Sequence, residues 1–306
     1  MKDRLKAMLL GSFAGDALAL GPHWVYNTHV IDKKFGTVDR FYDPLTSYHT
    51  GKKGGDFTHY GDQMLVLLES TATCGGFDPA HFAQSWRSFF ESYQGYFDHA
   101  TKDTLENMRA GKNLQVCGSS SDDLSGAARI APVVYVCRHD SAVLVDAARN
   151  QTTLTHNHET VVDAAAFLAL TVYMVLKGRS PSETLAEVLA DKFPSGPINA
   201  LVTKGLDSKS GDTRQTIAQF GQMCSIEAAL PATVHLIAKY EQDFRQAMVE
   251  NVMAGGDSAA RGILAGMVLG AACGTSEIPP EWIDGLNAHG RIVALMQSLD
   301  EKIGNS

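Results

Sequence analysis

Apolar residues recur every three or four positions along most of this chain, which is the spacing of one face of an α-helix. The first such stretch covers residues 3–20, and its apolar positions are Leu5, Met8, Leu9 and Phe13. A Gly-Pro pair follows directly and is expected to end the helix. The pattern predicts an amino-terminal helix with one buried side.

Further helices are predicted wherever this spacing returns. They cover residues 60–71, 78–93, 102–110, 124–138, 141–150, 161–176, 178–193, 212–219, 225–240, 241–253, 254–274, 279–286 and 291–299. Pro231 is expected to kink or split one of them, and residues 194–211 contain helix breakers. No run alternates like a strand and no period repeats, so the sequence predicts an all-α fold, a single compact multi-helix domain over residues 1–306.

The stretch 254–274 has the composition of a central helix. Gly262, Gly266 and Gly270 are spaced by four and therefore lie on one face. Each glycine inside a helix costs about 1 kcal/mol relative to alanine. Three of them on one stripe predict that another backbone packs very close to this helix.

The start of this central helix is its polar end. Asp257 and Ser258 follow a glycine pair, where free N–H groups and the helix dipole favour an anion or a carboxylate. Two interpretations stay open: Asp257 is only the N-cap, or it also faces a pocket. Asp62 lies in the first turn of the predicted helix 60–71, where a carboxylate is favoured for the same reason. Asp16 could be a cap, a buried acceptor or a site residue.

Residues 23–59 form the least regular part and are interpreted as a functional loop or lid. Aromatic residues here, with Lys52 and Lys53 nearby, could stack on a base and meet phosphate, although a surface loop anchored by aromatics fits equally well.

Arg129 could hold a phosphate or carboxylate, or form a salt bridge at a helix end. His156 could join His158 in a metal site, but a pocket-facing polar residue is favoured.

Composition narrows the function classes. Hydrophobic residues make up 44% and charged residues 20%, and the net charge of −8 argues against nucleic acid or an anionic membrane as partner. Five scattered cysteines without a CxxC pair indicate reduced thiols, which is typical of a cytoplasmic protein. We see no signal peptide or membrane span in the sequence.

Four segments, in this order, resemble the ADP-ribosylglycohydrolase family, which includes J1-crystallin-like and dinitrogenase-reductase-activating glycohydrolase proteins. They are MLLGSFAGDALALG, LSGAARIAPVV, TLTHNHETVVDAAAFLAL and NVMAGGDSAARGILAGMVLGAACG. The resemblance spans residues 1–286, with poor agreement at 23–59 and 194–221. It implies a helical bundle whose cleft binds ADP-ribose and holds two magnesium ions, and which hydrolyses the glycosidic bond to a modified side chain.

The chain departs from the family at both magnesium-binding runs. Ala259 and Ala260 stand where the resemblance implies an acid and a threonine, and Asp62 is the one acid near the other run. Magnesium prefers several oxygen ligands in near-octahedral geometry. We therefore expect no dinuclear magnesium centre and, as a metal site, at most a single weak ion between Asp62 and Asp257.

The resemblance also implies which residues contact substrate. These are Gly118, Ser119 and Ser120 as a cradle for the diphosphate, and Gly126, Arg129 and His156 at matching motif positions. Asp62 and Asp257 are then expected to face each other and act as a catalytic carboxylate pair without metal, with His59 or Tyr60 as an added acid or base. The expected partner is a small ADP-ribose-like ligand or an ADP-ribosylated protein.

Three hypotheses remain open at this stage. The first is a hydrolase of a glycosidic bond in an ADP-ribosylated or nucleoside-type substrate. The second is an inactive ADP-ribose-binding pseudoenzyme, and the third a crystallin-like structural protein. The two alanines favour the last two, while acids at two helix starts favour the first.

Overall fold

The computed structural model describes residues 2–304 and confirms the all-α prediction. In chain order its helices are α1 (Lys2–Leu20), α2 (Thr28–Phe35), η1 (Ser47–His49), α3 (His59–Cys74), α4 (Pro79–Ser92), α5 (His99–Arg109), α6 (Ser125–Ala128), α7 (Ala131–Cys137), α8 (Ser141–Thr153), α9 (Glu159–Leu176), α10 (Pro181–Lys192), α11 (Pro197–Asp207), α12 (Thr213–Phe220), α13 (Ile226–Lys239), α14 (Phe244–Met253), α15 (Ser258–Cys273), η2 (Thr275–Glu277), α16 (Pro280–Asp284) and α17 (His289–Gly304). Within the described residues, β-pairing is limited to two isolated bridges, Ser119–His156 and Asp123–Ser225.

Two helices were not predicted. The helix α2 lies inside the irregular stretch 23–59 and buries one side chain, Ile31, so its sequence has almost no apolar face to detect. The helix α11 lies in the stretch of breakers, where Pro197 occupies the first turn. A proline at that position starts a helix because its missing N–H would have no partner there. The expected split at Pro231 is also absent, since α13 continues through it.

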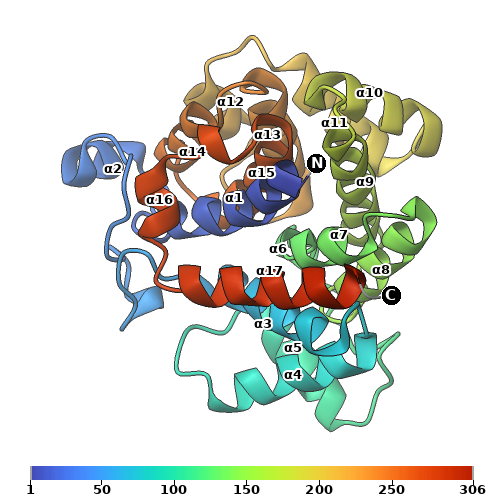
Figure 1. The fold of residues 1–306 in the computed structure, drawn as a ribbon. Helices are drawn as coiled ribbons and strands as arrows, with labels where there is room; N and C mark the ends of the chain where they lie inside the picture. The colour runs from blue at the N-terminus through green and yellow to red at the C-terminus, as the bar shows by residue number, and fades with distance from the viewer. Residues whose placement is uncertain (1, 305–306) are drawn as a thin grey trace.

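The glycine stripe of α15 packs against α1, as the sequence predicts. A Cβ atom added to Gly266 would lie 2.3 Å from the carbonyl oxygen of Gly11, and one added to Gly262 would lie 2.7 Å from that of Gly15. The two helices lie side by side in the middle of the bundle (Figure 1). We call this backbone contact the α1–α15 seam.

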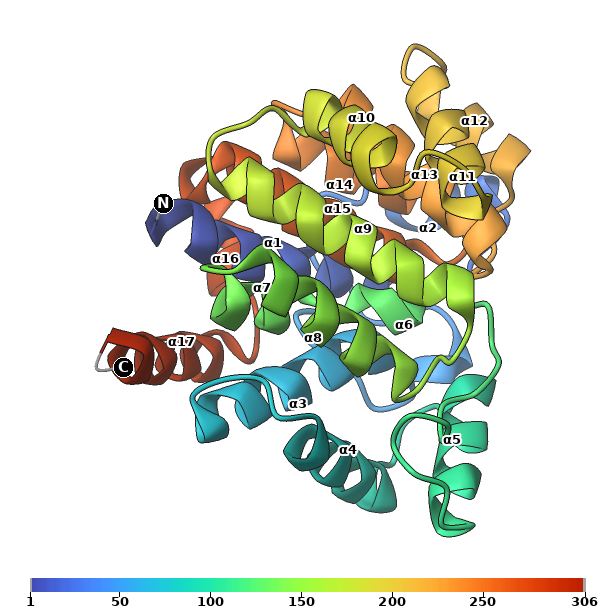
Figure 2. The same cartoon turned by 90° about the vertical axis from the view of Figure 1, so that its right-hand side faces the viewer.

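The long apolar helix α9 crosses one face of the bundle, with α8 and α10 beside it (Figure 2). It has the length and hydropathy of a membrane-crossing helix, and 61% of its length, residues 159–176, is buried inside the protein. Neighbouring helices therefore cover most of its apolar surface.

The seam positions the functional region at one end of the bundle. The helices α3, α4 and α5 form a separate layer beside α17 (Figure 1). At the first turn of α3, Tyr60 donates a hydrogen bond to Asp257, the N-cap of α15. Two helix starts that are far apart in sequence therefore meet at one place.

Candidate functional site

One hollow of about 450 Å³ opens where the loop after α1, the start of α3 and the segment between α4 and α5 converge. Its wall combines aromatic rings with acids and one thiol. The lining residues are Trp24, Tyr26, Tyr48, Tyr60, Tyr96, Asp98, His99, Ala100, Ser121, Asp122, Asp123 and Cys224. Flat rings next to carboxyl groups suit a ligand that carries both a ring system and a sugar.

Trp24 is the centre of the aromatic wall. Its ring lies 4.9 Å from those of Tyr48 and Tyr96, measured between centroids. Its backbone adopts a φ of 62°, which costs roughly 1 kcal/mol or more for a residue with a side chain. The amide of Trp24 donates to the carbonyl of Gly256 at 3.0 Å, so the start of α15 helps hold this conformation.

Asp257 is the N-cap of α15, and it is fully buried behind Tyr60, which lines the hollow. Its Oδ1 lies 3.2 Å from Nε2 of His23, and its Oδ2 accepts from the hydroxyl of Tyr60 at 3.0 Å. Burial lowers the pKa of His23 and favours a neutral ring. Such a ring donates from Nε2 to Asp257 and accepts at Nδ1 from His49, 2.7 Å away.

Asp123 and Cys224 lie next to Asp257. One polar atom of each of the three side chains falls within 4.8 Å of the others. The backbone holds Asp123 in place, because the bridge to Ser225 and the bond from the Leu124 amide to the Cys224 carbonyl join the two loops. Two carboxyl groups are thus packed together in a region that water hardly reaches.

The environments of these two acids move their pKa values apart. Burial, followed by the charges of Asp257 and Asp98, raises the pKa of Asp123. Burial would also raise the pKa of Asp257, but the hydrogen bond from His23 and the nearby charge of Arg261 outweigh it and the pKa is lowered. The raised pKa favours the protonated form of Asp123, and the lowered pKa favours the ionised form of Asp257.

Asp98 places an ionised carboxylate in the wall. Its Oδ1 accepts from the amide of Thr101 at 2.6 Å, and its Oδ2 lies 3.1 Å from Nε2 of His59. Burial would raise the pKa of Asp98, but the hydrogen bond from His59 holds it well below the ordinary range. The hollow thus presents an acid whose raised pKa favours the protonated form, Asp123, and a carboxylate, Asp98.

Asp62 does not join this group, so the expected facing pair with Asp257 is corrected. Its carboxylate is bonded to Lys52 and Tyr93 and lines a different hollow, of about 280 Å³. The reason is helical geometry: two residues apart on α3, Tyr60 and Asp62 project about 200° apart. The expectation of a single ion between Asp62 and Asp257 loses its geometric basis for the same reason.

Gly126, Arg129 and His156 come together in a buried network behind the hollow. Arg129 donates to Gln63 and Thr155, and also to Gln151. A Cβ atom on Gly126 would lie 2.5 Å from Cγ of the His156 ring. These side chains do not line the hollow itself, and burial lowers the pKa of His156 to about 3, so the ring is neutral.

The residues of the expected diphosphate cradle, Gly118 to Ser120, do not line the hollow; they come one to three positions before Ser121, the first residue of this loop that does. Gly118 packs against the backbone, since a Cβ there would lie 2.1 Å from the Thr153 carbonyl oxygen. Ser119 donates its hydroxyl to Asp103 at 2.7 Å, and Ser120 is exposed. The next residues of the same loop, 121–123, line the hollow.

The donor set does not fit a dinuclear magnesium centre. Ala259 and Ala260 are buried and offer no ligand atom, and the hydroxyl of Thr58 donates to Asp16. Both oxygens of Asp257 already accept hydrogen bonds, and the two groups within 4.8 Å of it are one carboxyl group, Asp123, and one sulfur, Cys224, whereas two magnesium ions need several oxygen ligands each.

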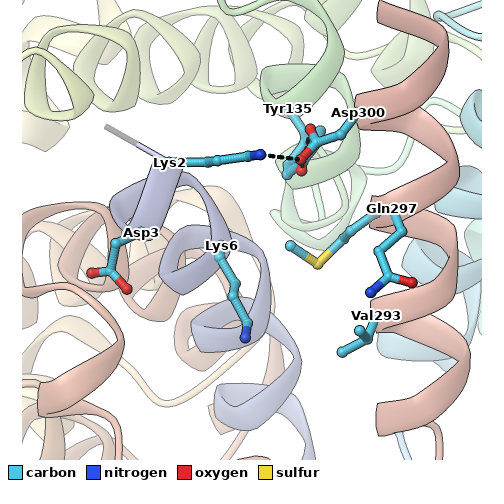
Figure 3. Close-up of a pocket in the computed structure, with 8 residues that line it drawn as sticks. Lys2, Asp3, Lys6, Tyr135, Val293, Gln297 and Asp300 are labelled. Carbon is cyan, nitrogen blue, oxygen red and sulfur yellow. Dashed lines mark hydrogen bonds and ion pairs between the residues drawn. The ribbon is translucent and has the colours of Figure 1, made fainter. Parts of the chain in front are cut away.

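A further hollow, of about 300 Å³, lies between the start of α1 and α17 (Figure 3). Lys2 approaches Asp300 at 3.8 Å, and Asp300 accepts from the hydroxyl of Tyr135 at 2.9 Å. Its lining is mainly the aliphatic parts of long side chains, and it has no aromatic wall or paired acids. We therefore take the aromatic hollow as the candidate site.

Sequence reasoning missed three of the residues that shape the site. Asp123 lies three residues after Ser120, the last residue of the expected diphosphate cradle, so its nearness to that cradle was the available signal. Asp98 and Cys224 lie in unremarkable contexts, and their roles depend on tertiary contacts. Asp16 is a buried acceptor for the amide and hydroxyl of Thr58.

Comparison with known proteins agrees with this architecture. The ADP-ribosylglycohydrolase family model matches residues 1–306. Crystallin J1A of Tripedalia cystophora is 24% identical, covering 98% of this chain and 97% of its own. ADP-ribosylarginine hydrolase Tri1 of Pseudomonas putida (strain GB-1) is 26% identical, covering 98% of this chain and 78% of its own. A solved chain of an ADP-ribosylglycohydrolase-related protein complex superposes with a TM-score of 0.76 at 21% identity, covering 99% and 98% of the two chains. The chain belongs to the ADP-ribosylglycohydrolase family.

Proposed function

We propose that this chain hydrolyses a glycosidic bond in an ADP-ribosylated or related nucleoside-type substrate, without a dinuclear magnesium centre. The observation that carries the proposal is Asp123, a buried acid with a raised pKa, which shares the wall of an aromatic hollow with Asp98 and lies within 4.8 Å of Asp257. Family membership supports a glycohydrolase-like activity in general. The substrate class comes from the relative named for ADP-ribosylarginine and from the rings of the wall.

The proposed reaction uses Asp123 twice. Its carboxyl proton passes to the leaving group while the bond between the sugar carbon and that group breaks. The positive charge that develops on the sugar is stabilised by Asp98 and, through the low-dielectric interior, by Asp257. Water then adds to the sugar carbon and returns a proton to Asp123, which restores the acid.

Turnover of ADP-ribosyl-arginine and ADP-ribosyl-serine peptides tests this proposal. We expect the parent to release ADP-ribose in the presence of EDTA. Asp123→Asn should slow release by about 10²–10⁴-fold, the range for loss of a general acid, and Asp257→Asn should also slow it. Asp284→Asn, which changes an exposed acid on α16, serves as control and should leave the rate unchanged. Full activity of Asp123→Asn would contradict the proposal, and loss with EDTA that magnesium restores would contradict its metal-free part.

A second candidate function is binding without turnover, or a purely structural role. It is favoured by the likeness to Crystallin J1A over nearly the whole chain and by the two alanines at the start of α15. Calorimetric titration with ADP-ribose separates these cases. Binding without release of product supports a pseudoenzyme, and neither binding nor turnover supports a structural protein.

A further inference from the structure

Two short segments each contribute a tyrosine ring to the wall of the aromatic hollow, and Asp62 contacts both segments. We call residues 47–52 and 93–98 the rim segments. The first carries Tyr48 and the second carries Tyr96, and both rings line the hollow. The two rings touch edge to face, with centroids 5.3 Å apart. The spacing of the rim segments therefore sets the spacing of these rings.

A single oxygen of Asp62 accepts a hydrogen bond from each rim segment. Nζ of Lys52 lies 2.6 Å from Oδ2, and the hydroxyl of Tyr93 lies 2.7 Å from the same atom. The side chains of Lys52 and Asp62 are 20% and 14% exposed, so water screens this ion pair less than a surface pair. The ammonium group of Lys52 also lies 5.8 Å from the centre of the Tyr93 ring. Asp62, Lys52 and Tyr93 therefore each contact the other two.

The other end of each rim segment is held by a histidine. His49, in the first segment, pairs with His23 at 2.7 Å. Asp98, at the end of the second, pairs with His59 at 3.1 Å. Besides the ring contacts with Trp24, each rim segment is thus held by polar side-chain contacts at two places, and Asp62 supplies one of these for both segments.

We propose that Asp62 is a positioning residue of the site. Its carboxylate fixes the two rim segments relative to each other, and thereby the placement of the Tyr48 and Tyr96 rings, which together form the wall against which the flat ring of a nucleoside-type ligand packs. The inference rests on the proposed function, because it takes the aromatic hollow as the place where that ligand binds. Asp62 lies outside the wall and acts through the segments it holds.

Hydrogen exchange of the full chain tests the connection without any ligand. Lys52→Met should speed exchange in residues 47–52 only, and Tyr93→Phe in residues 93–98 only. Asp62→Ala should speed it in both segments, while α15 keeps the exchange rate of the parent. Unchanged exchange in both segments of Asp62→Ala would overturn the proposal.

Steady-state kinetics tests whether the connection positions the ligand. Because stacking on aromatic rings contributes to binding, Asp62→Ala should raise KM for the ADP-ribosylated peptide about tenfold, with kcat changed less than about twofold. Asp62→Asn, which keeps an acceptor oxygen, should lie between the parent and Asp62→Ala. The matched control is Asp43→Asn, because Asp43 pairs with Lys53 in the same loop but both side chains are exposed. Asp43→Asn should leave KM unchanged.

Two outcomes separate the inference from the function on which it rests. A fall in kcat at unchanged KM would contradict a positioning role for Asp62. A parent that neither binds ADP-ribose nor hydrolyses the peptides would refute the proposed function, while the exchange pattern still decides whether Asp62 holds both rim segments. If Asp62→Ala fails to fold, Lys52→Met and Tyr93→Phe decide the question segment by segment.

Discussion

The α1–α15 seam and the aromatic wall of the hollow are close together at the start of α15, but different contacts hold them. We call the partly exposed tyrosines of that wall the rim. Along the seam, backbone meets backbone through Gly262 and Gly266, and no side chain can move aside. At the rim, the rings of Tyr26 and Tyr48 remain 48% and 49% exposed and are held by side-chain contacts. The difference indicates that the rigid part of the fold ends where the candidate site starts.

This contrast predicts different responses to mutation. A change in the seam should lower the free energy of unfolding, because overpacked backbone has no room to relax. A change at the rim should alter ligand binding and leave the free energy of unfolding almost unchanged, because exposed groups contribute little to stability.

Gly266→Ala should destabilise the protein by about 3 kcal/mol, since overpacking in a close contact costs roughly 1–3 kcal/mol or more. The added Cβ would lie 2.3 Å from the Gly11 carbonyl oxygen, so one helix must shift. Urea unfolding of the parent and variant measures the change. The control is Gly290→Ala in α17, where a Cβ would meet nothing within 4 Å and should change stability by no more than about 1 kcal/mol. Equal stability of the two variants would contradict the division between seam and rim.

The seam is also the part that the sequence predicts best. A stripe of glycines at a spacing of four indicates close packing by local geometry alone, and α1 and α15 both appear where their apolar spacing places them. The sequence predicts the site less well. The helix start of α15 points to Asp257, but whether Asp62 faces it depends on how α3 is rotated about its own axis, and the residue types of α3 do not determine that rotation. Asp98 entered the site through a contact with His59 from another helix.

The pH dependence of the free energy of unfolding tests the contact between Asp16 on α1 and Thr58 at the start of α3, which joins the seam to the site. Asp16, on α1, is fully buried and accepts two bonds from Thr58 at the start of α3. Burial raises its pKa from 3.8 to about 7, an effect that the bonds from Thr58 only partly offset. Between these values the folded protein keeps a proton that the unfolded chain releases. The free energy of unfolding should therefore fall as pH rises, by about 1.4 kcal/mol per pH unit for this group.

Other buried acids also contribute to that slope, so the informative measurement is a difference. Urea unfolding at pH 5 and pH 6 should show a steeper fall for the parent than for Asp16→Asn, which cannot titrate. The contribution is fully present below pH 4 and is lost as pH rises through about 7. Identical slopes for both proteins would show that Asp16 is ionised in the folded state.

Tyr48→Ala should produce the smallest free-energy change, and only in binding. Its ring is half exposed and contacts Trp24 and Tyr96 without a bond to the seam. Base–aromatic stacking contributes about 1–3 kcal/mol, and a half-exposed ring should lie at the lower end, so affinity for ADP-ribose should fall about fivefold. Quenching of Trp24 fluorescence measures the affinity, and urea unfolding should match the parent within about 0.5 kcal/mol. A variant that loses stability but binds ADP-ribose normally would place Tyr48 in the rigid part of the fold, and the boundary between seam and rim would have to be redrawn.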